Sequence, residues 1–256
     1  MPKWAPLISL VLVIALMIVH AASASARAWV WKVLAGFGAI GVVVVVYFGL
    51  FFAPREAYMS DVGRIIYVHI PFVWMCMVGF TVNVVCAVGY LFKANWKLDA
   101  LAEASAEVGI FFGACGVTMG SIWARPTWGV WWDWDPRLIS TTVMLLVYVG
   151  YLAFRSFTED PDRRAAWSAA GVILGYVTLP ITWFSVQWWN SLHQRQSDSQ
   201  TVDPAMRVGY LFSTVAFLAL FFVFVFKRYE ISRSRQSSAL ELPPLQAPAV
   251  KPEVSA

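Results

Sequence analysis

The chain has 256 residues, of which 59% are hydrophobic and only 13% are charged, and its formal net charge is +4. A soluble domain carries about twice that charged fraction, so this chain lacks the residues for a polar surface and is expected to face lipid. The positive charges are scattered over many short connections, which argues against nucleic-acid binding. The three cysteines, Cys76, Cys86 and Cys115, form no CxxC or CxxCH pattern, so neither a redox pair nor covalent haem attachment is indicated.

The first apolar stretch, residues 4–22, has more than one interpretation. It follows Lys3 and precedes Ala22-Ser23-Ala24, a pattern typical of a cleaved signal peptide. It is equally compatible with an extra membrane helix, or with an artefact of the assigned start codon. Residues 1–30 are therefore left as an N-terminal hydrophobic segment of open role.

Six later stretches reach the roughly 20 apolar residues that a helix needs to cross a bilayer. They are residues 31–53, 70–92, 105–124, 138–157, 166–188 and 206–226. Continuous apolar runs of this length exclude a β-barrel. The predicted fold is an all-α integral membrane bundle of six transmembrane helices, with a possible extra N-terminal helix. Pro180 falls midway along the fifth stretch and is expected to kink it.

Short connections between these stretches favour one membrane domain, which we place at residues 31–228. The segment 229–256 is rich in Ser, Pro, Ala and Gln, and we expect it to be a disordered tail.

The distribution of lysine and arginine predicts which loops face outward. If loops 54–69, 125–137 and 189–205 lie outside, the inner side carries eleven lysines and arginines and the outer side six. The positive-inside rule therefore places these three loops on the outer face and the C-terminus in the cytoplasm.

A tryptophan-rich loop connects the third and fourth of these stretches. Residues 121–140 read SIWARPTWGVWWDWDPRLIS and hold five tryptophans, Trp123, Trp128, Trp131, Trp132 and Trp134. Trp128, Trp131 and Trp132 have helical spacing, so we expect a short interfacial helix that presents them on one face. Asp135 followed by Pro136 suits the start of the next helix. An ordinary aromatic belt is the alternative to a platform for a flat aromatic ligand such as porphyrin.

Two of the three histidines, His69 and His193, fall on the same outer side as this loop. Two histidines beside an aromatic platform could ligate iron from opposite faces of a haem, although a loop histidine is often only solvated. Arg64, Arg137 and Arg125 are candidates for the haem propionates; the alternative is that they extend to lipid headgroups. For His20 we find no partner.

Three sequence blocks carry a family resemblance: WGVWWDWDPRL, GRIIYVHIP, and SVQWWNSLHQ followed by DPAMR. They resemble the WWD-motif haem-handling membrane proteins of cytochrome c biogenesis, and within them the haem exporter protein C (CcmC) family. The resemblance covers about residues 31–228. Two departures are Pro136, where the family usually has a small residue, and the length of residues 1–30.

The resemblance implies a function and a site. It makes His69 and His193 the two external haem-iron ligands, and Arg64 and Arg137 basic positions of the site. The haem-contacting loop would comprise Trp123, Trp128, Trp131, Trp132, Trp134 and Asp135. Haem b would be held transiently and non-covalently on the periplasmic face of the bacterial inner membrane. It would then pass to the haem chaperone CcmE, with CcmA, CcmB and CcmD as further partners, and the chain itself would not be an enzyme.

Two other functions are weighed against this one. A membrane b-type cytochrome for electron transfer usually has histidine ligands inside its spans, and the second to sixth spans hold no histidine in their interior. A channel for haem would need a polar path, which the nearly uncharged spans do not offer.

Overall fold

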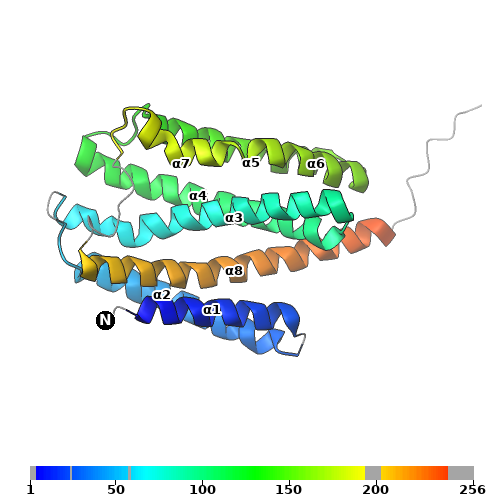
Figure 1. Ribbon diagram of the computed structural model, residues 1–256, viewed down its shortest axis with the longest axis horizontal. Helices are drawn as coiled ribbons and strands as arrows, with labels where there is room; N and C mark the ends of the chain where they lie inside the picture. Colours follow the sequence, from blue (N-terminus) through cyan, green and yellow to red (C-terminus); the bar gives the residue numbers. More distant parts are fainter. Residues whose placement is uncertain (1–3, 24, 57–58, 194–202, 242–256) are drawn as a thin grey trace, which may run out of the picture.

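The computed structural model describes residues 4–23, 25–56, 59–193 and 203–241, and helices dominate all of these ranges. The elements are α1 (Ala5–Ala22), α2 (Arg27–Phe51), the 3-10 helix η1 (Asp61–Ile65), α3 (Ile66–Lys93), α4 (Trp96–Trp128), α5 (Pro136–Phe157), α6 (Pro161–Gly175), α7 (Thr178–Trp188) and α8 (Pro204–Glu241). They run back and forth along the long axis of the molecule (Figure 1). Seven spans in the described part are long and apolar enough to cross a membrane.

The predicted all-α membrane fold is confirmed, because a helix covers each of the six predicted stretches. The first apolar stretch also folds as a helix, α1, which packs against α2 and α8. Val13 of α1 is buried against Val30 and Leu34 of α2. The imidazole of His20 is buried edge-on against Phe226 of α8, with ring centroids 3.8 Å apart.

The helices form three groups side by side (Figure 1). Helices α5, α6 and α7 lie on one side, α3 and α4 in the middle, and α8 with α2 and α1 on the other side. Aromatic rings join the groups: Phe80 of α3 stacks on Tyr148 of α5 at 3.5 Å, and Phe112 of α4 meets Phe221 of α8 at 5.7 Å.

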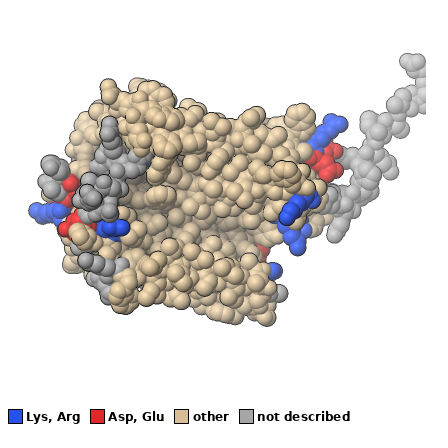
Figure 2. Space-filling model, viewed as in Figure 1, with Lys and Arg blue, Asp and Glu red and all other residues tan. Residues whose placement is uncertain are grey.

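On the face shown in Figure 2, the charged side chains lie at the two ends of the bundle, and uncharged residues cover the surface between them. We call the end where α4 finishes at Trp128 the tryptophan end. We call the opposite end, where Asp99 of α4 meets Arg155 of α5, the ion-pair end. This distribution is that of a protein whose middle faces hydrocarbon and whose ends face water.

The predicted interfacial helix through Trp128, Trp131 and Trp132 is wrong. Helix α4 already ends at Trp128, because Gly129 follows it with a φ of +80° in the left-handed region. Glycine adopts this conformation without the Cβ clash of other residues, and it commonly ends helices. Residues 129–131 then form a bend and residues 132–135 have no regular secondary structure, so the three tryptophans do not share a helical face.

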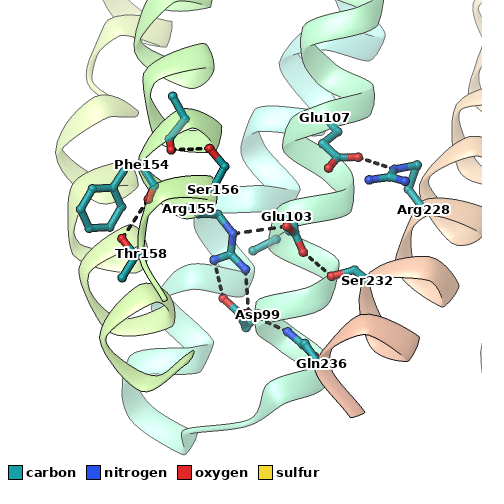
Figure 3. A network of polar contacts seen from close by, with 12 residues as sticks. Asp99, Glu103, Glu107, Phe154, Arg155, Ser156, Thr158, Arg228, Ser232 and Gln236 are labelled. Carbon is teal, nitrogen blue, oxygen red and sulfur yellow. Dashed lines mark hydrogen bonds and ion pairs between the residues drawn. The ribbon is translucent and has the colours of Figure 1, made fainter. Parts of the chain in front are cut away.

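The expectation of a disordered tail from residue 229 is also wrong for its first part, since α8 continues to Glu241. Ser232 and Gln236 are buried and donate hydrogen bonds to Glu103 and Asp99 of α4 (Figure 3). Polar residues that composition assigns to a solvated tail are held here by the buried carboxylate of Asp99 and the partly buried carboxylate of Glu103. Residues 242–256 lie outside the described part of the chain.

Buried charges anchor the ion-pair end. Arg155 of α5 donates to both carboxylate oxygens of Asp99, at 2.7 and 2.9 Å, and its Nε lies 3.6 Å from Glu103 (Figure 3). Arg228 of α8 pairs with Glu107. Three acidic residues near the start of α4, Asp99, Glu103 and Glu107, therefore join this helix to α5 and α8.

The predicted kink at Pro180 is confirmed. Proline lacks the N–H that would bond to the carbonyl of Tyr176. The helix is interrupted there, with α6 ending at Gly175 and α7 starting at Thr178. The second segment leads directly to the connection that carries His193.

Candidate functional site

His69 lies in the first turn of α3, two residues before Pro71. The missing N–H of Pro71 leaves the carbonyl of Tyr67 without its helical donor. The hydroxyl of Ser213 on α8 donates to that carbonyl instead. The carbonyl that lacks a donor within α3 therefore accepts a hydrogen bond from α8. This bond fixes the start of α3, which includes His69, against α8.

The ring orientation of His69 is set by α4. Its Nδ1 lies 3.1 Å from the carbonyl oxygen of Gly116. A carbonyl only accepts hydrogen bonds, so Nδ1 must carry the proton and donate it. In the neutral imidazole, Nε2 is then left with a lone pair. Histidines that ligate metals commonly have this arrangement, with the second ring nitrogen bonded to a backbone carbonyl.

Glycines on α4 make room for this imidazole. A Cβ built on Gly120 would lie 3.2 Å from Cε1 of His69, closer than an ordinary van der Waals contact. A Cβ on Gly116 would lie 3.2 Å from Cγ2 of Val73. These two glycines, one helical turn apart, let α3 approach α4 closely enough for the imidazole to reach the carbonyl of Gly116.

Trp123 lies next to both candidate histidines. Its ring centroid is 6.2 Å from that of His69 and 5.9 Å from that of His193. Trp128, one turn further along α4, lies 5.8 Å from Trp123 and 6.4 Å from His193. Two histidines from distant parts of the chain therefore meet around one pair of tryptophans.

A cavity of about 350 Å³ opens beside these tryptophans. It is lined by Met59, Val62, Trp123, Pro126, Thr127, Trp128 and Leu192. The side chain of Trp123 is buried, and its indole N–H has no hydrogen-bond partner among the residues that the structure describes. A buried donor without a partner costs free energy, so the site fits a ligand that combines a large apolar surface with an acceptor.

Asp135 joins the tryptophan loop to the His193 segment. It is 4% exposed and caps α5 by accepting a hydrogen bond from the N–H of Arg137 at 2.8 Å. It also accepts from the hydroxyl of Ser191 at 2.9 Å and from the N–H of Leu192 at 2.6 Å. The predicted helix cap is confirmed, and the additional bonds to the second loop are new.

The three candidate arginines occupy different surroundings. Arg137 donates to the carbonyls of Thr182 and Trp183 on α7, at 2.5 and 3.1 Å. Arg125 is exposed and donates to the carbonyl of Gly129 at the end of α4.

Arg64 lies in η1 and is largely buried. Its Nη1 bonds to the carbonyl of Leu50 at 3.2 Å and lies 3.0 Å from a carboxylate oxygen of Asp61. Its Nε is buried and has no hydrogen-bond partner in the described part of the chain. Of the three arginines, Arg64 and Arg137 are thus held inside the tryptophan end, whereas Arg125 caps a helix at the surface.

The structure brings together only part of the predicted tryptophan platform. Trp123 and Trp128 line the cavity, whereas Trp131 and Trp134 are 59% and 79% exposed. The ring centroid of Trp132 lies 6.3 Å from that of Trp134. Gly116, Gly120 and Ser191 are functional candidates that the sequence analysis missed. The small-residue spacing of the two glycines could have revealed a close helix contact; no local pattern marks Ser191.

Comparisons with known proteins agree with one another. A sequence profile of the family described as "Heme exporter protein C" matches residues 9–241. The chain is 39% identical over 196 residues to the Heme exporter protein C of Escherichia coli K12, covering 75% of this chain and 72% of that protein. The counterpart from Bradyrhizobium diazoefficiens is 33% identical over 190 residues, 72% of each chain. That of Haemophilus influenzae is 32% identical over 206 residues, 78% of this chain and 82% of that protein.

Proposed function

Because the chain belongs to the haem exporter protein C family, a family of cytochrome c biogenesis and haem transport, we propose that it holds haem b, its cargo, between His69 and His193. The haem is bound non-covalently and only in transit. In this proposal the chain is a carrier and not an enzyme, since its residues bind and orient the cargo without making or breaking its bonds.

The hydrogen bond from His69 to Gly116 is the observation that carries the proposal. It leaves Nε2 as the nitrogen with a lone pair, in a side chain that α3 and α4 hold in one orientation. His193 supplies the second imidazole, next to the same tryptophan ring. Bound haem would supply an iron atom, which the imidazoles of His69 and His193 would hold.

The neighbouring side chains support an amphiphilic cargo. Trp123 and Trp128 offer aromatic surface along the cavity. The indole N–H of Trp123, which bonds to no described residue, can donate to a carboxylate. Arg64 and Arg137 are the basic groups we assign to the propionates, with Arg125 as an outer cation. Trp131, Trp132 and Trp134 extend the aromatic surface along the loop that follows α4.

We place this site on the periplasmic face of the bacterial inner membrane. The ion-pair end carries the larger number of lysines and arginines, and the positive-inside rule assigns that end to the cytoplasm. The tryptophan end then faces the periplasm, where the haem chaperone CcmE receives the haem. CcmA, CcmB and CcmD would complete the assembly.

The proposal is tested by purifying the full chain in detergent and recording its optical spectrum. We expect a low-spin, six-coordinate haem in the wild type and loss of this spectrum in both His69→Ala and His193→Ala. His20→Gln is the matched control, because His20 is the third histidine and is buried far from the site against α8. A low-spin spectrum that survives in the double variant His69→Ala/His193→Ala would overturn the ligand assignment. Transfer of the co-purified haem to CcmE tests the second half of the proposal.

A further inference from the structure

We propose that Asp135 and Ser191 together position the proposed iron ligand His193, so that the Asp of the tryptophan motif acts on haem through a histidine and not by touching it. The inference rests on the proposed function, because it assigns the means by which one of the two ligands is held. The geometry around Asp135 carries it.

Both carboxylate oxygens of Asp135 are used. Oδ1 accepts from the N–H of Arg137 and from the hydroxyl of Ser191, and Oδ2 accepts from the N–H of Leu192 at 2.6 Å. The residue is nearly fully buried. A buried carboxylate that accepts three donors forms strong bonds in defined directions, so the backbone at residues 191 and 192 is tied to the first turn of α5.

A helix cap alone does not require this arrangement. Asp160 occurs in the same Asp-Pro pattern, caps α6 by accepting from the N–H of Arg163 at 2.7 Å, and is exposed. Asp135 makes the corresponding cap with Oδ1 and in addition directs Oδ2 at the segment that follows α7. The bonds to Ser191 and Leu192 are what distinguish Asp135 from Asp160.

Ser191 passes this constraint on to His193. The Ser191 hydroxyl donates to Asp135 and accepts from the N–H of His193 at 3.0 Å. The backbone of His193 is therefore two hydrogen bonds away from the carboxylate. Its ring then lies against Trp123 and Trp128, on the side of the bundle from which His69 approaches.

Two substitutions separate this role from helix capping. In Ser191→Ala the cap is untouched, but the link between Asp135 and the N–H of His193 is removed. In Asp135→Asn the side-chain oxygen can still cap α5, since asparagine is as good a cap as aspartate; its amide hydrogens would then face the N–H of Leu192. Asp160→Asn and Ser156→Ala are the matched controls, because they make the same chemical changes at the ion-pair end.

The experiment measures spin state and haem retention in the purified full chain. We expect Ser191→Ala and Asp135→Asn to convert part of the haem from low to high spin, with haem loss to a scavenger faster by about tenfold, the effect of roughly one charge-assisted hydrogen bond. Added imidazole should restore the low-spin spectrum of both variants by replacing the displaced ligand. The controls should match the wild type.

A second comparison tests whether the effect passes through His193. In a His193→Ala background, adding Asp135→Asn should cause no further change in spin state or retention. Wild-type spectra in both single variants, haem loss that imidazole does not reverse, or additive effects with His193→Ala would each overturn the positioning role. If the proposed function itself is wrong, the wild type already lacks a low-spin haem that depends on His193, which is a different result.

Discussion

The Nδ1 atom of His69, on α3, lies 3.1 Å from the carbonyl oxygen of Gly116, on α4. This contact fixes the tautomer of the imidazole as well as its position. It depends on a close approach of the two helices, and a Cβ at Gly120 would press on the imidazole at 3.2 Å.

Substitution of Gly120 should therefore displace His69. We expect Gly120→Ala to weaken haem retention moderately, since its Cβ would press on Cε1 of His69 at 3.2 Å. The larger Gly120→Val should abolish low-spin haem. Gly171→Ala and Gly171→Val are suitable controls, because a Cβ at Gly171 meets nothing within 4 Å. Optical spectra of the purified variants provide the measurement, and a normal spectrum in Gly120→Val would contradict the packing argument.

Replacement of Trp123 by phenylalanine should have opposite effects on stability and on binding. Trp123→Phe removes a buried N–H that has no partner within residues 4–23, 25–56, 59–193 and 203–241. A buried group of this kind costs about 1–3 kcal/mol when unsatisfied. We expect the haem-free protein to keep or raise its melting temperature, while haem is lost faster. Trp134→Phe, at an exposed position of the same loop, should change neither quantity. A lower melting temperature with unchanged haem retention would show that Trp123 serves packing alone.

The buried ion pair at the ion-pair end should dominate local stability. Arg155→Met leaves the carboxylate of Asp99 buried without its bidentate partner. Breaking such a pair costs about 3–5 kcal/mol. Lys227→Met breaks an ion pair whose side chains are each 49% exposed, and exposed pairs contribute about 0–1 kcal/mol. Unfolding of both variants in detergent, followed by circular dichroism, compares the two effects directly; equal losses would contradict this ranking.

Truncation of α8 should define where the folded chain ends. Removal of residues 242–256 leaves every described contact in place, so we expect an unchanged melting temperature. Removal from residue 230 onward deletes Ser232 and Gln236, which donate to Glu103 and Asp99, and should lower it clearly. A truncation at 230 that behaves as the full chain would restore the original interpretation of a tail without structural role.

The membrane-spanning helices could be predicted from the sequence. So could the grouping of His69, His193 and Trp123 at one end of the bundle. Each apolar run and each cluster of charges indicates by itself whether that segment lies in the membrane or outside it, so these predictions need only local sequence. The pairing of Arg155 with Asp99, and that of Asp135 with Ser191, could not be predicted in this way. Each joins residues 56 positions apart, and no local periodicity encodes which helices become neighbours.

The tryptophan loop was misjudged for a more local reason. The spacing of Trp128, Trp131 and Trp132 is compatible with a helix. Gly129, however, adopts a positive φ, and the helix ends there. A glycine between residues with helical spacing can adopt a positive φ and so end the helix before the later residues join it. The composition of the segment after residue 229 also led to a wrong prediction of disorder, because Ser232 and Gln236 donate hydrogen bonds to Glu103 and Asp99.

The length of α4 also sets the depth of the site in the bilayer. From Asp99 to Trp123 the helix rises about 36 Å at 1.5 Å per residue, somewhat more than the roughly 30 Å of hydrocarbon in a typical membrane. With the carboxylates of Asp99 and Glu103 held at one headgroup layer, Trp123 and the cavity emerge at the other. Lipids with longer acyl chains would bury that opening in the bilayer, and shorter ones would bring it closer to water. Membrane thickness would then affect how easily the proposed haem acceptor reaches the proposed site.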